Sequence, residues 1–316
     1  MRVLITGASG FAGGHLAVAC DAAGDEVIGL SRGGEVPAGE RRSVDLLDLA
    51  DTRNAVRGVQ PDVVYHLAAL SSVGRSWQAP AQTMTENTAT AVNVLEAVRH
   101  EAPGARVVWV SSCEVYSAEQ PLPIAEDGEL GPATPYAVSK ISGELLARVY
   151  AEAHGLEIVR VRPFNHAGPG QSPTFVLSSL ARQAAQARRA NARVVRIVTG
   201  NPHTRRDFTD VRDVVRAYRL LAETGNPGVY NVSSGSSVST TDQLNMLADL
   251  IAPMRIDHVV DPALVRPHEV MDRRGSHERL TADTGWAPEI PLPQTMADTV
   301  AWWETRLPAS EGSATA

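Results

Sequence analysis

The chain has 316 residues, of which 43% are hydrophobic and 21% charged, as in ordinary globular proteins with a large core or two subdomains. Its formal net charge of −7 at pH 7 excludes general nucleic-acid binding, which depends on a basic surface. Its two cysteines, Cys20 and Cys113, exclude a disulfide scaffold and indicate a reducing compartment, so we expect a cytoplasmic protein.

The two ends of the chain are expected to be simple. The opening MRVLIT reaches a glycine cluster too soon for a signal peptide, so it is expected to form a strand. No apolar run approaches the ~18 residues that a membrane-spanning helix needs, and we expect no membrane partner. The last residues, 309–316, are small and polar and are expected to form a disordered tail.

Short runs rich in valine and isoleucine alternate with helical stretches in the first half of the chain. We expect buried strands at 2–7, 26–32, 61–69, 105–112 and 157–164. Helices are expected between them at 11–24, 84–101 and 134–155. Runs without strict alternation suit strands covered on both faces, and strand–helix alternation predicts a parallel sheet. The fold class is therefore α/β, with a doubly wound parallel sheet.

The second half of the chain is less regular. It predicts helices at 174–190 and 239–251, and strands at 193–200 and 229–234. Two proline-rich stretches, 253–267 and 287–293, are expected to be loops. We expect these elements to form a smaller α/β lobe over the carboxyl edge of the sheet, where open α/β sheets bind ligands.

A glycine-rich loop follows the first expected strand and opens the first helix. Its segment TGASGFAGG, at 6–14, has glycines in a GxxGxxG spacing. Glycines allow a tight turn and close approach to a pyrophosphate, and a helix N-terminus offers free N–H groups to an anion. The alternative is a turn that only packs a helix on a strand. We predict a dinucleotide site formed by Gly7, Ser9, Gly10, Phe11, Ala12 and Gly13.

The end of the second expected strand indicates which dinucleotide binds. A bare NAD ribose usually needs an acidic residue there, but this chain has Ser31 and Arg32. A serine and a guanidinium suit a 2′-phosphate, so we predict NADP(H), the alternative being that Arg32 is a solvated loop residue. Asp45 and Leu46 follow the next short apolar run, where the carboxylate could reach the adenine amino group.

The segment PYAVSK, at 135–140, places Tyr136 one helical turn before Lys140. Positions i and i+4 share a helix face, and a nearby ammonium lowers the pKa of a phenol. Tyr136 could then act as an acid or base near neutral pH. Taken alone, the six residues also fit a solvated pair on a surface helix.

Four segments taken together resemble a known family. They are the TGxxGxxG opening, HLAA at 66–69, VSS at 110–112 and YxxxK at 136–140. In this order they are similar to the extended short-chain dehydrogenase/reductases that act on nucleotide sugars, over nearly the whole chain to about residue 305. The resemblance implies that Tyr136 is the catalytic acid/base and that Lys140 lowers its pKa and holds the nicotinamide ribose. It also implies that Ser112 hydrogen-bonds the reacting sugar oxygen, and that the cofactor is lined by Leu67, Ala68 and Ala69.

Later segments resemble one branch of that family, the reductases of GDP-4-keto-6-deoxy-mannose that form GDP-rhamnose in deoxysugar biosynthesis. The similar segments are RPFNHAGPGQSPTFV, RRDFTDVRDVVRAY, YNVSSG and RRGSHERL. This implies NADPH-dependent reduction of the C4 ketone of a GDP-4-keto-6-deoxy-hexose, without a metal. It implies a homodimer built on helices 134–155 and 84–101. It also implies a GDP-sugar site formed by Ser71, Ser112, Asn165, Phe175, Val176, Arg206, Arg266 and Glu269.

Within that implied site, Arg206 and Arg266 would clamp the diphosphate and Glu269 would hold a ribose hydroxyl. For Arg206, which precedes Asp207, a surface ion pair is the alternative.

Glu114 keeps other activities open. Dehydratases of this family use a glutamate in this place as the base that removes the C5 proton, and here it follows Cys113 rather than an acid. The alternatives are therefore a GDP-mannose 4,6-dehydratase-like or 4-epimerase activity with recycled NADP. A non-catalytic NADP(H)-binding regulator is a third alternative, against which the presence of Ser112, Tyr136 and Lys140 counts.

These expectations give a domain division. Residues 1–165, with a returning segment at about 193–235, are predicted to form a Rossmann-type NADP-binding domain. Residues 166–192 and 236–308 are predicted to form the nucleotide-sugar-binding lobe.

Overall fold

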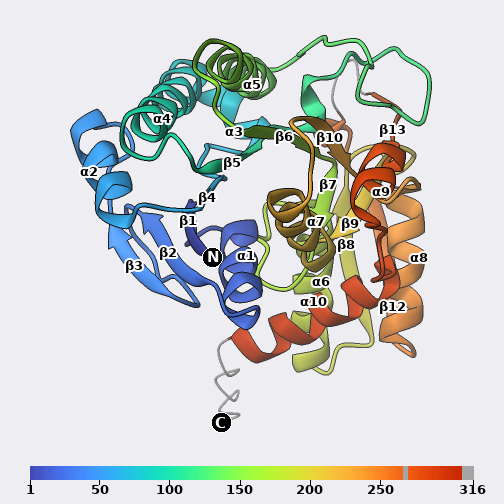
Figure 1. Ribbon diagram of the computed structural model, residues 1–316. Helices are drawn as coiled ribbons and strands as arrows, with labels where there is room; N and C mark the ends of the chain where they lie inside the picture. Colours follow the sequence, from blue (N-terminus) through green and yellow to red (C-terminus); the bar gives the residue numbers. More distant parts are fainter. Residues whose placement is uncertain (266–269, 308–316) are drawn as a thin grey trace.

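The computed structural model describes residues 1–265 and 270–307, and its main feature is a seven-stranded sheet (Figure 1). The strand order is β10-β6-β5-β4-β1-β2-β3, and every neighbouring pair is parallel. The order reverses at β1, whose neighbours are β2 and β4, so the sheet is doubly wound, as the sequence predicts. The strands are β1 Arg2–Thr6, β2 Glu26–Ser31, β3 Glu40–Ser43, β4 Val63–His66, β5 Arg106–Val110, β6 Ile158–Pro163 and β10 Gly228–Val232.

Helices cover both faces of this sheet (Figure 1). On one face, α1 (Phe11–Ala22) and α7 (Val211–Glu223) pack into a core with β1, β4, β5 and β6. On the other face, α2 (Leu49–Val59), α4 (Pro80–Glu101) and α5 (Pro135–His154) form a second core. Burial on both faces explains why the inner strands are apolar runs without alternation, whereas the edge strand β3 is polar and largely exposed.

A smaller lobe lies beside the sheet. Its β8 (Val194–Thr199) pairs with β12 (Arg255–Val260). Its β9 (Arg205–Asp210) pairs with β7 (Asn165–Ala167), β11 (Ser237–Ser239) and β13 (Asp272–Arg273). Its core is formed by α6 Val176–Arg189, α8 Thr240–Ile251 and α10 Leu292–Arg306. Shorter elements are α3 Val73–Gln78, η1 Cys113–Val115, η2 Pro262–Leu264 and α9 Glu278–Thr284.

The lobe differs from the sequence-based expectation in two respects. Of the strands within 193–235, only β10 joins the large sheet, whereas β8 and β9 pair inside the lobe. The expected loop at 253–267 contains β12 and η2, and the expected loop at 287–293 ends in the first turn of α10. Proline is tolerated in the first turn of a helix, and β12 exists through its pairing with a strand about 60 residues away.

The domain division itself stays a prediction, and the expected tail at 309–316 lies outside the described residues. Within the described ranges, no helix combines the length and apolarity needed to cross a membrane.

Local signals at α5 explain its position in the fold. Thr134 caps its first turn by accepting a hydrogen bond from the Ala137 N–H at 3.0 Å, and Pro135 occupies the first turn. The helix ends at Gly155, whose φ of 67° lies in the left-handed region. These signals start α5 at Pro135, so Tyr136 lies in its first turn. Tertiary packing then places this turn at the carboxyl edge of the sheet, where Lys140 reaches the last residue of β5.

Candidate active site

A cleft of about 1370 Å³ runs along the carboxyl edge of the large sheet and on between the sheet and the lobe. All the predicted site residues that the structure describes line it. These are Gly7, Ser9, Gly10, Phe11, Ala12, Gly13, Ser31, Arg32, Asp45, Leu46, Leu67, Ala68, Ala69, Ser71, Ser112, Glu114, Tyr136, Lys140, Asn165, Phe175, Val176 and Arg206. Arg266 and Glu269 lie outside the described residues. The structure thus brings the candidates together, while their roles stay predictions.

The glycine loop forms a cradle at the N-terminus of α1. Gly7 has a φ of 73°, and a Cβ atom there would lie 3.0 Å from the Ala68 backbone. A Cβ atom on Gly13 would lie 2.2 Å from the Gly7 carbonyl oxygen, a distance that no side chain tolerates. The loop is therefore so tight at these two positions that only glycine fits, and the first residues of α1 line the cleft. This arrangement fits the pyrophosphate of a dinucleotide.

Two guanidinium groups lie near the end of β2. The Arg41 Nε donates to the Oγ of buried Ser31 at 3.0 Å, and the Arg32 Nη2 contacts a carboxylate oxygen of Glu86 at 3.3 Å. The sequence analysis missed Arg41, because it reaches Ser31 only through the pairing of β3 with β2. A serine bonded to one guanidinium group, with a second arginine next to it in the chain, fits a phosphate on the adenosine ribose.

Hydrogen bonds to Thr6, the last residue of β1, hold the segment that follows β4. The Thr6 Oγ1 accepts hydrogen bonds from the Leu67 and Ala68 N–H groups, each at 3.2 Å. It also lies 2.9 Å from Nδ1 of His66, whose pKa burial lowers to about 3. A neutral His66 can accept a hydrogen bond from the Thr6 hydroxyl. The Thr6 oxygen can then accept hydrogen bonds from both backbone N–H groups. These hydrogen bonds hold the start of the segment 67–69, which lines the cleft.

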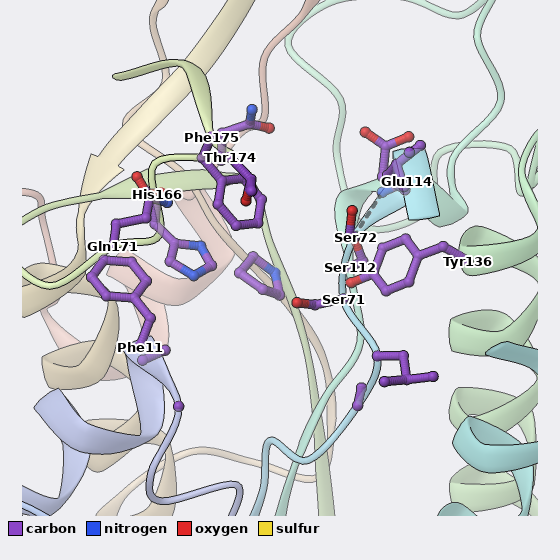
Figure 2. Close-up of a pocket in the computed structure, with 18 of the residues that line it drawn as sticks. Phe11, Ser71, Ser72, Ser112, Glu114, Tyr136, His166, Gln171, Thr174 and Phe175 are labelled. Carbon is purple, nitrogen blue, oxygen red and sulfur yellow. Dashed lines mark hydrogen bonds between the residues drawn. The ribbon is translucent and has the colours of Figure 1, made fainter. Parts of the chain in front are cut away.

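Ser112, Tyr136 and Lys140 meet at the end of β5. Figure 2 shows the Tyr136 ring directed toward Ser112, with Glu114 above them. Ser112 caps the short helix η1, and its Oγ accepts from the Glu114 N–H at 3.2 Å. The buried Lys140 Nζ donates to the Val110 carbonyl at 2.5 Å. A phenol, a hydroxyl and an ammonium therefore share one wall of the cleft.

Burial dominates the electrostatics of this group. Burial raises the pKa of Tyr136, and the Ser112 hydroxyl opposes the increase only in part. Burial dominates here and the Lys140 ammonium is directed at the Val110 carbonyl, so the lowering of this pKa by Lys140 stays a prediction. Burial also lowers the pKa of Lys140 to about 8, against the attraction of Glu144. Tyr136 is thus held in its protonated form, ready to donate.

The opposite wall of the cleft comes from β7 and the start of α6. There the His166 ring stacks on Phe11, with ring centres 5.9 Å apart and planes at 7°, and Phe175 projects at the rim (Figure 2). Asn165, on β7, lies one residue before His166. Phe11 belongs to the glycine loop, so this stack joins the cofactor end of the cleft to the lobe.

Two arginines enter the cleft from the lobe. The Arg206 Nη1 donates to the Arg205 and Val270 carbonyls at 2.7 and 2.8 Å. The sequence analysis missed Arg273, which is buried and donates to the Cys113 carbonyl at 2.6 Å. Only the tertiary structure brings Arg273 to the wall of the cleft that holds Ser112 and Tyr136. Among residues 1–265 and 270–307, no cluster of three or more histidine, cysteine or acidic side chains could hold a metal ion.

Comparisons with known proteins agree with this geometry. The sequence model of the GDP-mannose 4,6 dehydratase family matches residues 4–299. GDP-6-deoxy-D-mannose reductase of Pseudomonas aeruginosa is 37% identical over 97% of this chain and 98% of its own. UDP-glucose 4-epimerase of Mycolicibacterium smegmatis is 30% identical over 97% and 99%. The structure of RMD from Pseudomonas aeruginosa complexed with NADPH has a TM-score of 0.86 at 34% identity, covering 97% of this chain and 98% of its own.

Proposed function

The chain belongs to the extended short-chain dehydrogenase/reductases that act on nucleotide sugars, within the GDP-mannose 4,6-dehydratase family, and we propose that it reduces the C4 ketone of a GDP-4-keto-6-deoxy-hexose with NADPH. The main support is the 37% identity to GDP-6-deoxy-D-mannose reductase along nearly the whole chain. The placement of Ser112, Tyr136 and Lys140 on one wall of the cleft supports it further.

In this proposal the cofactor lies along the carboxyl edge of the sheet. The glycine loop would hold its pyrophosphate, and Ser31, Arg32 and Arg41 would hold the 2′-phosphate. Lys140 would hold the nicotinamide ribose beside Tyr136. The bound cofactor supplies the hydride that reaches C4 of the sugar.

The residues of the chain then handle the proton and the developing charge. The Tyr136 phenol donates its proton to the sugar O4 as the C4 carbonyl becomes an alcohol. The Ser112 hydroxyl donates a hydrogen bond to the same oxygen and keeps its own proton. The charged Lys140 stabilises the phenolate that Tyr136 becomes. Acid–base assistance of this kind typically contributes ~10²–10⁴ in rate.

The lobe would hold the nucleotide. Arg206 enters the cleft from β9, where a guanidinium can pair with a diphosphate, while Ser71, Asn165, Phe175 and Val176 would contact the sugar side. Arg266 and Glu269 are assigned to the diphosphate and a ribose hydroxyl by the family resemblance alone.

The test is NADPH absorbance with GDP-4-keto-6-deoxy-mannose, followed by product analysis. Oxidation of one NADPH per sugar, with formation of a GDP-6-deoxyhexose, is the expected result and also gives the C4 configuration. An unchanged absorbance with an intact keto sugar would contradict the reductase assignment.

Glu114 supports a second candidate, a dehydratase that recycles NADP. It lines the cleft next to Ser112, where a base could reach the sugar (Figure 2). Its neighbour Cys113 is buried, and burial raises the pKa of the thiol to about 12. A neutral thiol therefore precedes Glu114, at the position where the dehydratases described above would have an acid. Conversion of GDP-mannose to its 4-keto-6-deoxy form without net cofactor change, and its loss in Glu114→Gln, would favour this candidate.

We also propose a homodimer in the cytoplasm. On α5, the partly exposed side chains of Val138, Leu145 and Val149 share one face, and α5 packs beside α4. A second copy could cover this face with the same two helices. Cys20 and Cys113 are free and buried, which suits a reducing compartment.

A further inference from the structure

Some buried polar groups among the described residues lack a hydrogen-bond partner, and three of the residues that carry them line the cleft. The groups are the Ser111 hydroxyl, the Tyr218 hydroxyl and the Gln243 side-chain oxygen. A buried polar atom without a partner costs folding free energy, so such atoms are rare in native proteins. Inside a ligand cleft, the missing partner can be a bound ligand.

Tyr218 is the most informative of the three. It lies on α7, is fully buried, and packs into the core on the α1 face of the sheet. Tyr136 comes from α5 on the opposite face, yet both tyrosines line the same cleft. The part of the cleft that these two tyrosines share therefore lies at the carboxyl edge between both faces, where the reaction would take place.

We propose that the Tyr218 hydroxyl donates a hydrogen bond to the nicotinamide end of the bound cofactor. The inference rests on the proposed function, which brings the nicotinamide beside Tyr136. The only hydrogen-bonding substituent on a nicotinamide ring is its carboxamide, and a neutral phenol is a suitable donor for the carboxamide oxygen. Burial raises the pKa of Tyr218, which keeps the phenol in its neutral, donating form.

Tyr65 provides a matched control within the same core. It is also fully buried, belongs to the same cluster of apolar side chains, and has a hydroxyl without a hydrogen-bond partner among the described residues. It does not line the cleft. Replacing either tyrosine by phenylalanine removes one unpaired hydroxyl from one core, but only Tyr218→Phe would remove a ligand contact.

The experiment compares Tyr218→Phe and Tyr65→Phe with the wild-type protein in two measurements. Without cofactor, thermal unfolding of both variants is expected at or above the wild-type midpoint, because an unsatisfied hydroxyl is removed. Isothermal titration with NADPH is expected to give a Kd about three- to tenfold higher for Tyr218→Phe, as for one lost hydrogen bond. The Kd of Tyr65→Phe is expected to stay at the wild-type value.

Two results would overturn the inference alone. A wild-type NADPH affinity in Tyr218→Phe would show that the hydroxyl has no partner in the cofactor. A lowered midpoint in Tyr218→Phe but not in Tyr65→Phe would show that the hydroxyl is already paired within the protein. A wild-type protein that fails to bind NADPH would overturn the proposed cofactor as well, so the two failures are distinguishable.

Discussion

Tyr136 and Lys140 are one helical turn apart, but their surroundings give them different roles. Tyr136 is buried at the start of α5 beside Ser112, and burial keeps its phenol protonated. Lys140 is equally buried and is directed at the Val110 carbonyl, and its pKa falls to about 8. At neutral pH the chain therefore presents a proton donor next to a buried positive charge.

Tyr136→Phe is expected to lower kcat by ~10²–10⁴, because the proton donor is lost. NADPH binding is expected to be nearly unchanged, because the ring remains in place. Steady-state kinetics and titration with NADPH would measure both.

Tyr116→Phe is the control for that variant. The Tyr116 hydroxyl donates to the Asn231 Oδ1 at 2.7 Å inside the core, away from the proposed chemistry. Its loss is expected to cost roughly 1–3 kcal/mol of unfolding free energy and to leave kcat unchanged. If both variants lost kcat equally, Tyr136 would have a structural role.

Lys140→Met is expected to raise the unfolding free energy at neutral pH. The folded chain gives up the Lys140 proton at about pH 8 and the unfolded chain at about 10.5, so the unfolded state holds more protons between these values. Wild-type stability therefore rises with pH through this interval, by roughly 3 kcal/mol. In denaturant titrations, the difference in unfolding free energy between the variant and the wild type is expected to shrink from pH 8 to pH 10.5. A difference that stays constant over this interval would contradict a buried charge at Lys140.

At the level of elements, the turn from β1 into α1 shows how one local geometry forms a binding site. The turn brings the Gly7 carbonyl so near to Gly13 that no side chain fits between them. The Gly10 N–H donates to the same Gly7 carbonyl at 2.9 Å, which closes the loop under the helix N-terminus. The first turn of α1 then lines the cleft.

Gly13→Ala is expected to disrupt the loop, because its Cβ atom would lie 2.2 Å from the Gly7 oxygen. Unfolding free energy should fall by ~1–3 kcal/mol, and the Kd for NADPH should rise at least about tenfold. Gly14→Ala is the matched control in the same helix, since its Cβ atom meets Pro37 only at 3.4 Å. Gly14→Ala should keep NADPH binding, and its unfolding free energy should rise by up to ~1 kcal/mol because alanine has the higher helix propensity. Equal loss of NADPH binding in both variants would contradict the assignment of the glycine loop as the pyrophosphate site.

For the whole molecule, the large sheet and the lobe contribute different parts of one cleft. The sheet edge brings the glycine loop and the wall that holds Ser112 and Tyr136, while β9 brings Arg206 and the N-cap of α6 brings Phe175. The helices α4 and α5 cover one face of the sheet, whereas the cleft lies at its carboxyl edge. A dimer formed through these helices would therefore leave the cleft open.

The proposed dimer is expected to dissociate in the double variant Leu145→Glu and Val149→Glu, because two charges would be buried in an apolar contact. Light scattering should then give the mass of one chain instead of two. Val18→Glu, at a similarly exposed valine on α1, should leave the dimer intact. A wild-type mass of one chain would contradict the proposed assembly.

Much of the fold was predictable because its signals are local. The inner sheet strands are apolar runs, and Thr134, Pro135 and Gly155 mark the two ends of α5 by rules that act within a few residues. The edge strand β3 has the sequence ERRS, which carries no such signal, and it was not predicted. The strands β8, β9 and β12 were assigned less well, because pairing between distant segments decides which sheet they join.

The sequence by itself determined the glycine loop, the pairing of Tyr136 with Lys140 on one helix face, and the doubly wound sheet. Each depends on spacing along the chain and on the chemistry of the residue type. The tertiary structure alone decided that Arg41 reaches Ser31, that Arg273 reaches Cys113, and that Tyr218 lines the cleft with an unpaired hydroxyl. It also decided the protonation of Tyr136, because the pKa of a phenol depends on burial, and burial depends on contacts between segments far apart in sequence.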